Sequence, residues 1–203
     1  MRRRVQLAVM RRAAQLADRI VSTTSPDRVP SMQDPEIRAK TLLLPVDSYL
    51  PSTQPKVQRN GNRVPMIIVF GFTNFSSETS MVAWVLSRAA EIVGPLHLTV
   101  YGRGAKVASR MLLPLLAGSA VELEGFGILE GKVDSSLLTN ADVQLFVRSD
   151  RSSRRGSGIA GIACGLPIIG LSDTETAFPI TEAGVRLVPM GDREGLVREV
   201  VLA

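Results

Sequence analysis

Residues 141–169 read ADVQLFVRSDRSSRRGSGIAGIACGLPII, and this stretch decides how the chain folds. The apolar run at 143–147 predicts a buried strand, the small residues at 157–164 predict a helix, and 167–169 predicts a second strand. Several arginines lie between the first strand and the helix. Fixed cations, free backbone N–H groups and the positive end of a helix dipole form a surface that suits a phosphate group.

Arg154, Arg155, Gly156 and Ser157 are therefore the predicted contacts of a diphosphate. Two guanidinium groups can neutralise its charges with bidentate geometry, and glycine allows an anion to approach its backbone N–H closely. The alternative is a solvated basic turn before an ordinary helix N-cap. The small residues further along this helix are interpreted as packing residues; they are Gly161, Ala163 and Cys164. Gly165 is expected to end the helix.

Strands and helices alternate from residue 65 to residue 203. This pattern predicts an α/β fold, a Rossmann-like and mostly parallel sheet with helices on both faces. Strands are expected at 66–70, 96–101, 120–123, 143–147, 167–169 and 185–188, and helices at 78–92 (N-cap Ser77), 105–113 (ended or kinked by Pro114), 131–138, 157–164 and after Asp192.

Ligands of such sheets bind at the carboxyl ends of the strands. Gly71 and the Gly102-Arg103-Gly104 turn directly follow strands, as does Arg148. Gly71, Gly104 and Arg148 are therefore weaker candidates for the same ligand crevice. The Gly102–Gly104 turn also matches the start of a dinucleotide-binding fingerprint, but Val107 stands at its third small position.

The first 64 residues differ in character from the rest. A helix is expected at 3–18, short strands at 19–23 and 41–44, a loop at 24–39 and a linker at 45–64. The sequence thus predicts an N-terminal remnant with a linker at 1–64 and one larger domain at 65–203.

Charge is distributed unevenly between these two parts. Residues 1–64 hold 12 Lys and Arg against 5 Asp and Glu, whereas residues 65–203 hold 12 against 14. A slightly acidic domain with one local cationic cluster suits a small anion better than nucleic acid.

No uncharged apolar run is long enough for a membrane span, and one cysteine cannot form an internal disulfide, so a cytoplasmic protein is expected. His97, the one histidine, is interpreted as structural, and no zinc ligand cluster is present.

The 141–169 segment resembles the donor-binding core of GT-B-type nucleotide-sugar glycosyltransferases. The resemblance extends upstream through 119–139 and downstream through 182–200, where EAGVRLVPMGDREGLVREV is similar to the closing segment of that family. It implies two Rossmann-like domains facing each other across a cleft, of which the C-terminal domain binds the nucleotide-diphosphate sugar. Arg154, Arg155, Gly156 and Ser157 would contact the diphosphate without a metal or other cofactor.

The chain also departs from that family. Residues 1–23 resemble the last helix and strand of an N-terminal acceptor domain, whose remainder is missing, so a missing domain or partner protein is expected to pack there. Many retaining members carry two glutamates with seven residues between them, at positions that correspond to Ser152 and Ala160 here. The ribose-contacting role of the later glutamate therefore does not carry over.

Two alternatives remain beside a glycosyltransferase donor half. One is a non-catalytic nucleotide-binding or interaction module that pairs with a separate partner domain. The other is a dinucleotide-dependent oxidoreductase that uses the Gly102–Gly104 turn.

Overall fold

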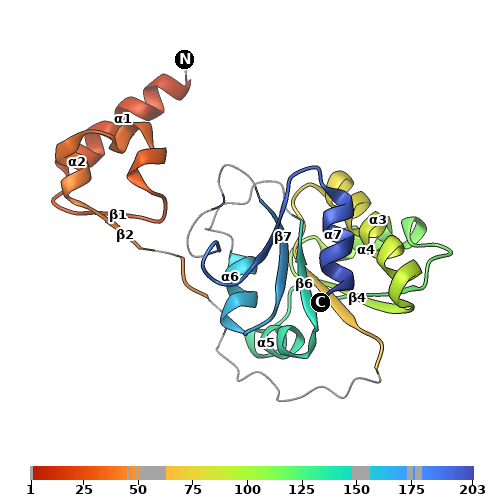
Figure 1. The fold of residues 1–203 in the computed structure, drawn as a ribbon. Coiled ribbons are helices and arrows are strands. Elements are labelled where there is room, and N and C mark those ends of the chain that lie inside the picture. The colour runs from red at the N-terminus through yellow and green to blue at the C-terminus, as the bar shows by residue number, and fades with distance from the viewer. Residues whose placement is uncertain are drawn as a thin grey trace. The chain divides into compact units, whose positions relative to one another are not determined.

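A computed structural model describes residues 2–44, 46–48, 50, 63–147, 156–172, 176 and 180–203. The chain forms two compact units, Met1–Val46 and Asp47–Ala203 (Figure 1). The sequence places the domain boundary between residues 64 and 65, and most of the intervening residues lie outside the described part. Arg148, Arg154 and Arg155 also lie outside it, so their roles stay predictions.

The first unit is built around two short parallel strands, in which Ile20 pairs with Thr41 and Ser22 with Leu43. Its elements, two of them single 3₁₀ turns, are α1 (Arg2–Leu16), β1 (Ile20–Ser22), η1 (Pro26–Arg28), η2 (Pro30–Met32), α2 (Pro35–Ala39) and β2 (Thr41–Leu43).

Helix α2 corrects the prediction of a loop throughout 24–39. The carboxylate of Asp34 accepts a hydrogen bond from the Glu36 N–H at 3.0 Å, and Pro35 occupies the first turn. Proline suits that position because its fixed φ is already helical and its missing N–H would have no partner there.

The second unit contains a six-stranded sheet and five helices among the described residues. Its elements are β3 (Met66–Phe70), α3 (Phe75–Val93), β4 (Leu96–Tyr101), α4 (Ala105–Leu115), β5 (Val121–Gly125), α5 (Gly131–Asn140), β6 (Val143–Phe146), α6 (Gly156–Ala163), β7 (Ile168–Ser172), β8 (Arg186–Pro189) and α7 (Arg193–Val201).

The strand order is β5-β4-β3-β6-β7-β8, and every pair is parallel. Strand β3 pairs with β4 on one side, through Met66 and His97, and with β6 on the other, through Ile67 and Val143. After β3, the chain therefore adds β4 and β5 on one side of the sheet. It then crosses to the other side and adds β6, β7 and β8. The predicted α/β fold with a parallel sheet is confirmed.

Helices cover both faces of this sheet because side chains alternate along its strands. Ile67 and Val69 of β3 pack into a core with α3, α4 and α7. Ile68 and Phe70 point the other way, into a second cluster that includes Leu138 of α5 and Ala160 of α6. Figure 1 shows α5 and α6 on one side of the sheet and α3, α4 and α7 on the other.

Two local predictions are corrected. Helix α3 begins at Phe75 with Asn74 as its N-cap residue, so Ser77 lies inside the first turn instead of capping it. Pro114 falls in the last turn of α4, which ends one residue later. By contrast, Asp192 caps α7 as predicted, with its carboxylate accepting from the Gly195 N–H at 2.7 Å.

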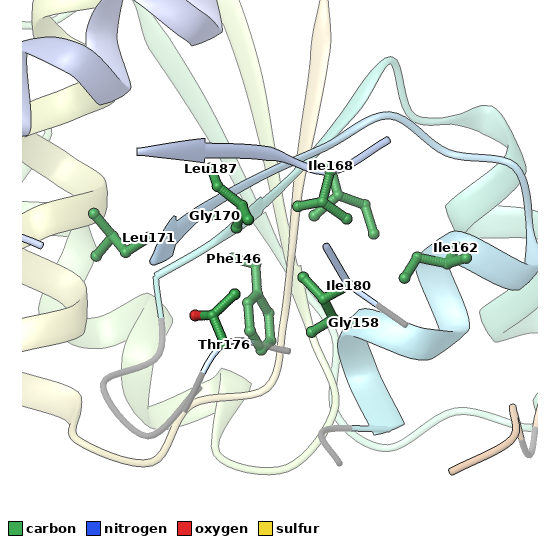
Figure 2. A pocket seen from close by; sticks show the side chains of 10 residues that line it. Phe146, Gly158, Ile162, Ile168, Gly170, Leu171, Thr176, Ile180 and Leu187 are labelled. Atoms are coloured by element: carbon green, nitrogen blue, oxygen red, sulfur yellow. The ribbon is translucent and has the colours of Figure 1, made fainter. Parts of the chain in front are cut away.

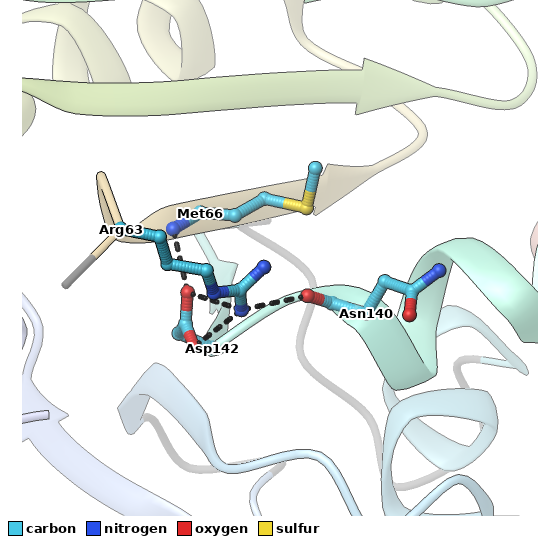
Figure 3. Close-up of polar contacts among 4 residues, drawn as sticks. All are labelled: Arg63, Met66, Asn140 and Asp142. Atoms are coloured by element: carbon cyan, nitrogen blue, oxygen red, sulfur yellow. Dashed lines mark hydrogen bonds and ion pairs between the residues drawn. The ribbon is translucent and has the colours of Figure 1, made fainter. Parts of the chain in front are cut away.

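Asp142 joins the two central strands at their amino ends (Figure 3). Its carboxylate accepts a hydrogen bond from the Met66 N–H at 2.7 Å and contacts the Arg63 guanidinium at 2.8 and 3.0 Å. The same guanidinium donates to the carbonyl of Asn140 at 3.1 Å. One side chain therefore fixes the start of β3, the start of β6 and the preceding chain at Arg63.

Replacing Asp142 by Ala should lower the free energy of unfolding by about 1–2 kcal/mol, because the Met66 N–H loses its acceptor and Arg63 loses its carboxylate partner. Arg63→Ala should cost less than about 1 kcal/mol, since this ion pair is solvent-exposed. Urea denaturation followed by circular dichroism measures both. Equal losses for the two variants would contradict the role given to the Met66 hydrogen bond.

Candidate functional site

The strand order of the second unit singles out the carboxyl ends of β3 and β6. Sheets of this order bind ligands where the order reverses, outside the carboxyl ends of the two strands concerned. Gly71 follows β3 there, and Val147 follows β6. The helices that start after these strands are α3 and α6.

Three loops are joined by backbone hydrogen bonds at this edge of the sheet. The Gly71 N–H donates to the Tyr101 carbonyl at 2.8 Å, the Phe72 N–H to Arg103 at 3.3 Å, and the Gly102 N–H to Gly127 at 3.1 Å. The loops after β3, β4 and β5 therefore form one wall, which contains both Gly71 and Gly104. The N–H of Gly71 is already used within this wall.

Gly104 serves the packing of the wall. Its φ is 80°, and a Cβ placed on it would lie 2.7 Å from the ring of Phe75. The turn that contains it follows β4, the neighbour of β3, whereas a dinucleotide-binding turn follows the first strand of the sheet at the reversal. This position gives no support to the oxidoreductase alternative.

The first turn of α3 carries an acidic residue. Glu78 lies in the first turn and is only 2% exposed. Its carboxylate accepts hydrogen bonds from the N–H and the hydroxyl of Thr73, both at 2.8 Å. Glu78 thus supplies the negative charge that a helix start attracts, and it holds the loop after β3.

The start of α6 differs from that of α3 because its first turn carries no acidic residue. Gly156 is half-buried and Ser157 is buried. Of the predicted diphosphate contacts, the structure therefore places these two beside the reversal of strand order.

Helix α6 ends as the sequence predicts. Gly165 has a φ of 66°, and its N–H donates to the Ile162 carbonyl at 3.0 Å. The Leu166 N–H donates to the Gly161 carbonyl at 3.0 Å. This pair of bonds is a Schellman motif with glycine at C′.

A buried glutamine of the sheet, Gln144, contacts α6. The sequence pattern did not identify it. Gln144 of β6 is 0% exposed, and its Nε2 donates to the Ser157 carbonyl at 3.0 Å. A Cβ on Gly161 would overlap Oε1 of Gln144, so the predicted packing role of Gly161 is confirmed. Cys164 is buried in the second cluster as predicted, whereas Ala163 is exposed, which corrects its assignment to packing.

An apolar pocket lies beside α6, at the ends of β6 and β7 (Figure 2). Its walls include Phe146, Gly158, Gly170 and Ile180, and Thr176 lies close to the Phe146 ring in Figure 2. The cavity volume is about 10 Å³, the lower limit for one water molecule. A ring-sized ligand would have to displace one of these side chains.

His97 lies at the other end of the sheet. Its Nδ1 is 3.5 Å from the Glu122 carboxylate and its Nε2 is 3.5 Å from Glu124, both on the edge strand β5. These carboxylates become partners only through strand pairing, which explains why no acid partner is evident in the sequence.

Among the described residues, no group of three or more His, Cys, Asp or Glu could hold a metal ion, and no helix is long and apolar enough to cross a bilayer.

No protein-family model and no curated protein matches this chain. Solved structures match it in fold. The apo lipopolysaccharide outer core galactosyltransferase WaaB is 12% identical with a TM-score of 0.60, over 91% of this chain and 52% of its own. A UDP-forming α,α-trehalose-phosphate synthase from Burkholderia xenovorans is 13% identical with a TM-score of 0.62, over 92% and 53%.

This is the fold of GT-B glycosyltransferases. The chain spans about half the length of these enzymes and matches a C-terminal-like half. The C-terminal domain of the group 1 glycosyltransferase LpcC from Francisella tularensis, 13% identical with a TM-score of 0.53, aligns over 77% of this chain and 86% of its own. The second unit makes up about three quarters of the chain, so the longer enzymes also match part of the first unit.

The hydrogen bonds between Glu78 and Thr73 should make the effects of substituting these two residues on stability non-additive. Glu78→Met removes both hydrogen bonds to Thr73, and Thr73→Val removes the one from the hydroxyl. We expect each variant to lower stability by about 1–2 kcal/mol, and the double variant to lose clearly less than the sum, because the hydroxyl hydrogen bond is lost in both. Urea denaturation of the four proteins gives the coupling energy. Additive losses would show that this hydrogen bond does not hold the loop after β3.

Proposed function

We propose that this chain is the donor-binding half of a glycosyltransferase, which binds a nucleotide-diphosphate sugar at the carboxyl ends of β3 and β6. One observation carries the proposal: of the two helices that start at the reversal of strand order, α3 carries the buried Glu78 carboxylate in its first turn, and α6 has no acidic residue in its first turn. The GT-B fold supports a sugar-transfer function at the level of the superfamily.

In this proposal the diphosphate lies at the start of α6. The amides of Gly156 and Ser157 donate to its oxygens, and Arg154 and Arg155 neutralise its charge, with Arg148 nearby. The bond between the sugar's anomeric carbon and the diphosphate oxygen breaks during transfer, and its electron pair leaves with the diphosphate. Preorganised donors and cations stabilise that developing charge, so no metal is required.

A uridine diphosphate is the first nucleotide to test, because the trehalose-phosphate synthase of matching fold is UDP-forming. Gly71 and Gly104 contribute indirectly in this proposal, by shaping the wall beside the diphosphate. The acceptor-binding residues and any catalytic base are not assigned to this chain.

UDP should bind the wild-type chain, and the double substitution Arg154→Ala/Arg155→Ala should weaken it at least about tenfold, since each charge-assisted hydrogen bond contributes about 1.5–3 kcal/mol. Isothermal titration calorimetry with UDP, GDP and uridine measures this. Arg88→Ala/Arg198→Ala, which removes two exposed cations elsewhere, is the matched control and should leave the affinity unchanged. A folded wild-type chain that binds neither UDP nor GDP at millimolar concentration would refute the proposal.

A second candidate function is an interaction module that completes a transferase with a partner domain through residues 1–23. It is favoured by the first unit, whose parallel strands leave Val21 and Leu42 63% and 57% exposed. Helix α1 also exposes Val9, Met10 and Leu16. Parallel sheets are normally covered on both faces, so this surface suits further strands and helices of an α/β domain. A monomer that transfers sugar without any partner would exclude this candidate.

A further inference from the structure

The most unusual buried side chain in the second unit is Gln144. It lies in β6, in the middle of the sheet, and no part of it is exposed. Its Nε2 donates to the Ser157 carbonyl at 3.0 Å, while its Oε1 accepts no hydrogen bond from the described residues. A buried amide that is only half satisfied lowers stability relative to an apolar side chain of similar shape.

Helix α6 does not need this hydrogen bond to form. In an α-helix the carbonyl of Ser157 accepts from the N–H four residues later, which is that of Gly161. The Gln144 amide is therefore a second donor to a carbonyl that is already paired. Glycine at 161 is required for it, because a Cβ there would overlap Oε1 of Gln144.

We propose that Gln144 is a positioning residue that fixes the first turn of α6 relative to the sheet. The hydrogen bond to Ser157 joins the rigid central strand β6 to the turn that carries the amides of Gly156 and Ser157. A fixed turn keeps those N–H groups aimed at one place, so an anion meets donors that need not reorganise. This inference rests on the proposed function, in which that turn holds the diphosphate.

Gln144→Met separates positioning from stability. Methionine has a similar length and fills irregular space, but it cannot donate to the Ser157 carbonyl. We expect an unchanged or higher urea midpoint for this variant, because the unsatisfied Oε1 is removed. We also expect its affinity for UDP and for inorganic pyrophosphate to fall about five- to tenfold, with no change in its affinity for uridine.

Thr99→Val is the matched control. Thr99 lies in β4, is 0% exposed, and its hydroxyl likewise has no hydrogen-bond partner among the described residues. Its replacement also removes a buried unsatisfied oxygen, but not one that contacts α6. We expect its urea midpoint to hold or rise and its affinities for UDP and pyrophosphate to match those of the wild type.

Calorimetry and urea denaturation of the three proteins decide between the outcomes. If the wild type binds UDP and Gln144→Met binds it equally well, Gln144 does not position the turn. If the variant's urea midpoint falls and uridine affinity falls with it, the role is structural, and the inference is also overturned. If the folded wild type binds neither UDP nor pyrophosphate, the proposed function itself fails. The two preceding outcomes concern Gln144→Met alone and leave the proposed function standing.

Discussion

The parallel pairing of β3 with β6 is the constraint on which the rest of the second unit depends. Because β4 and β5 extend the sheet on one side and β7 and β8 on the other, the loops after β3 and β6 leave the sheet in opposite directions. Sheets of this order bind their ligands between two such loops. Asp142 reinforces this pairing from the opposite end, where one carboxylate holds the starts of both strands.

The two helices that begin at the reversal are not equivalent. A helix start attracts negative charge, and the first turn of α3 carries the buried Glu78 carboxylate, which accepts from Thr73. The first turn of α6 has no acidic residue. The start of α3 is therefore bound to the loop before it through Glu78, whereas the start of α6 is a candidate anion site. Gln144 and Gly161 bring α6 close to the sheet and join its first turn to β6.

Most of the fold could be predicted from the sequence, because its signals are local. Apolar runs such as 66–70, the Asp192 cap and the Gly165 helix end follow from periodicity and turn chemistry. Helix α2 was missed because three prolines made its surroundings resemble a loop, although Asp34-Pro35 is itself a helix-start signal.

The candidate site was less predictable, because its contacts join residues that are distant in sequence. The sequence pattern predicts Glu78 as the first residue of a helix, and only the three-dimensional turn brings Thr73 to its carboxylate. Gln144 stands in a strand of otherwise apolar residues and has no partner nearby in the sequence; its partner lies 13 residues away, across the loop that carries the arginines. The strand order that selects β3 and β6 is likewise a property of the whole sheet.

In the proposed function, the amides at the start of α6 bind a pyrophosphate. Titration of the ¹⁵N-labelled chain with UDP, followed through its amide resonances, detects this contact residue by residue. We expect saturable shifts at Gly156 and Ser157 that inorganic pyrophosphate reproduces, with little change at Gly104 or Thr73. Shifts confined to the starts of α3 or α4, or no shift at all in the folded chain, would contradict it.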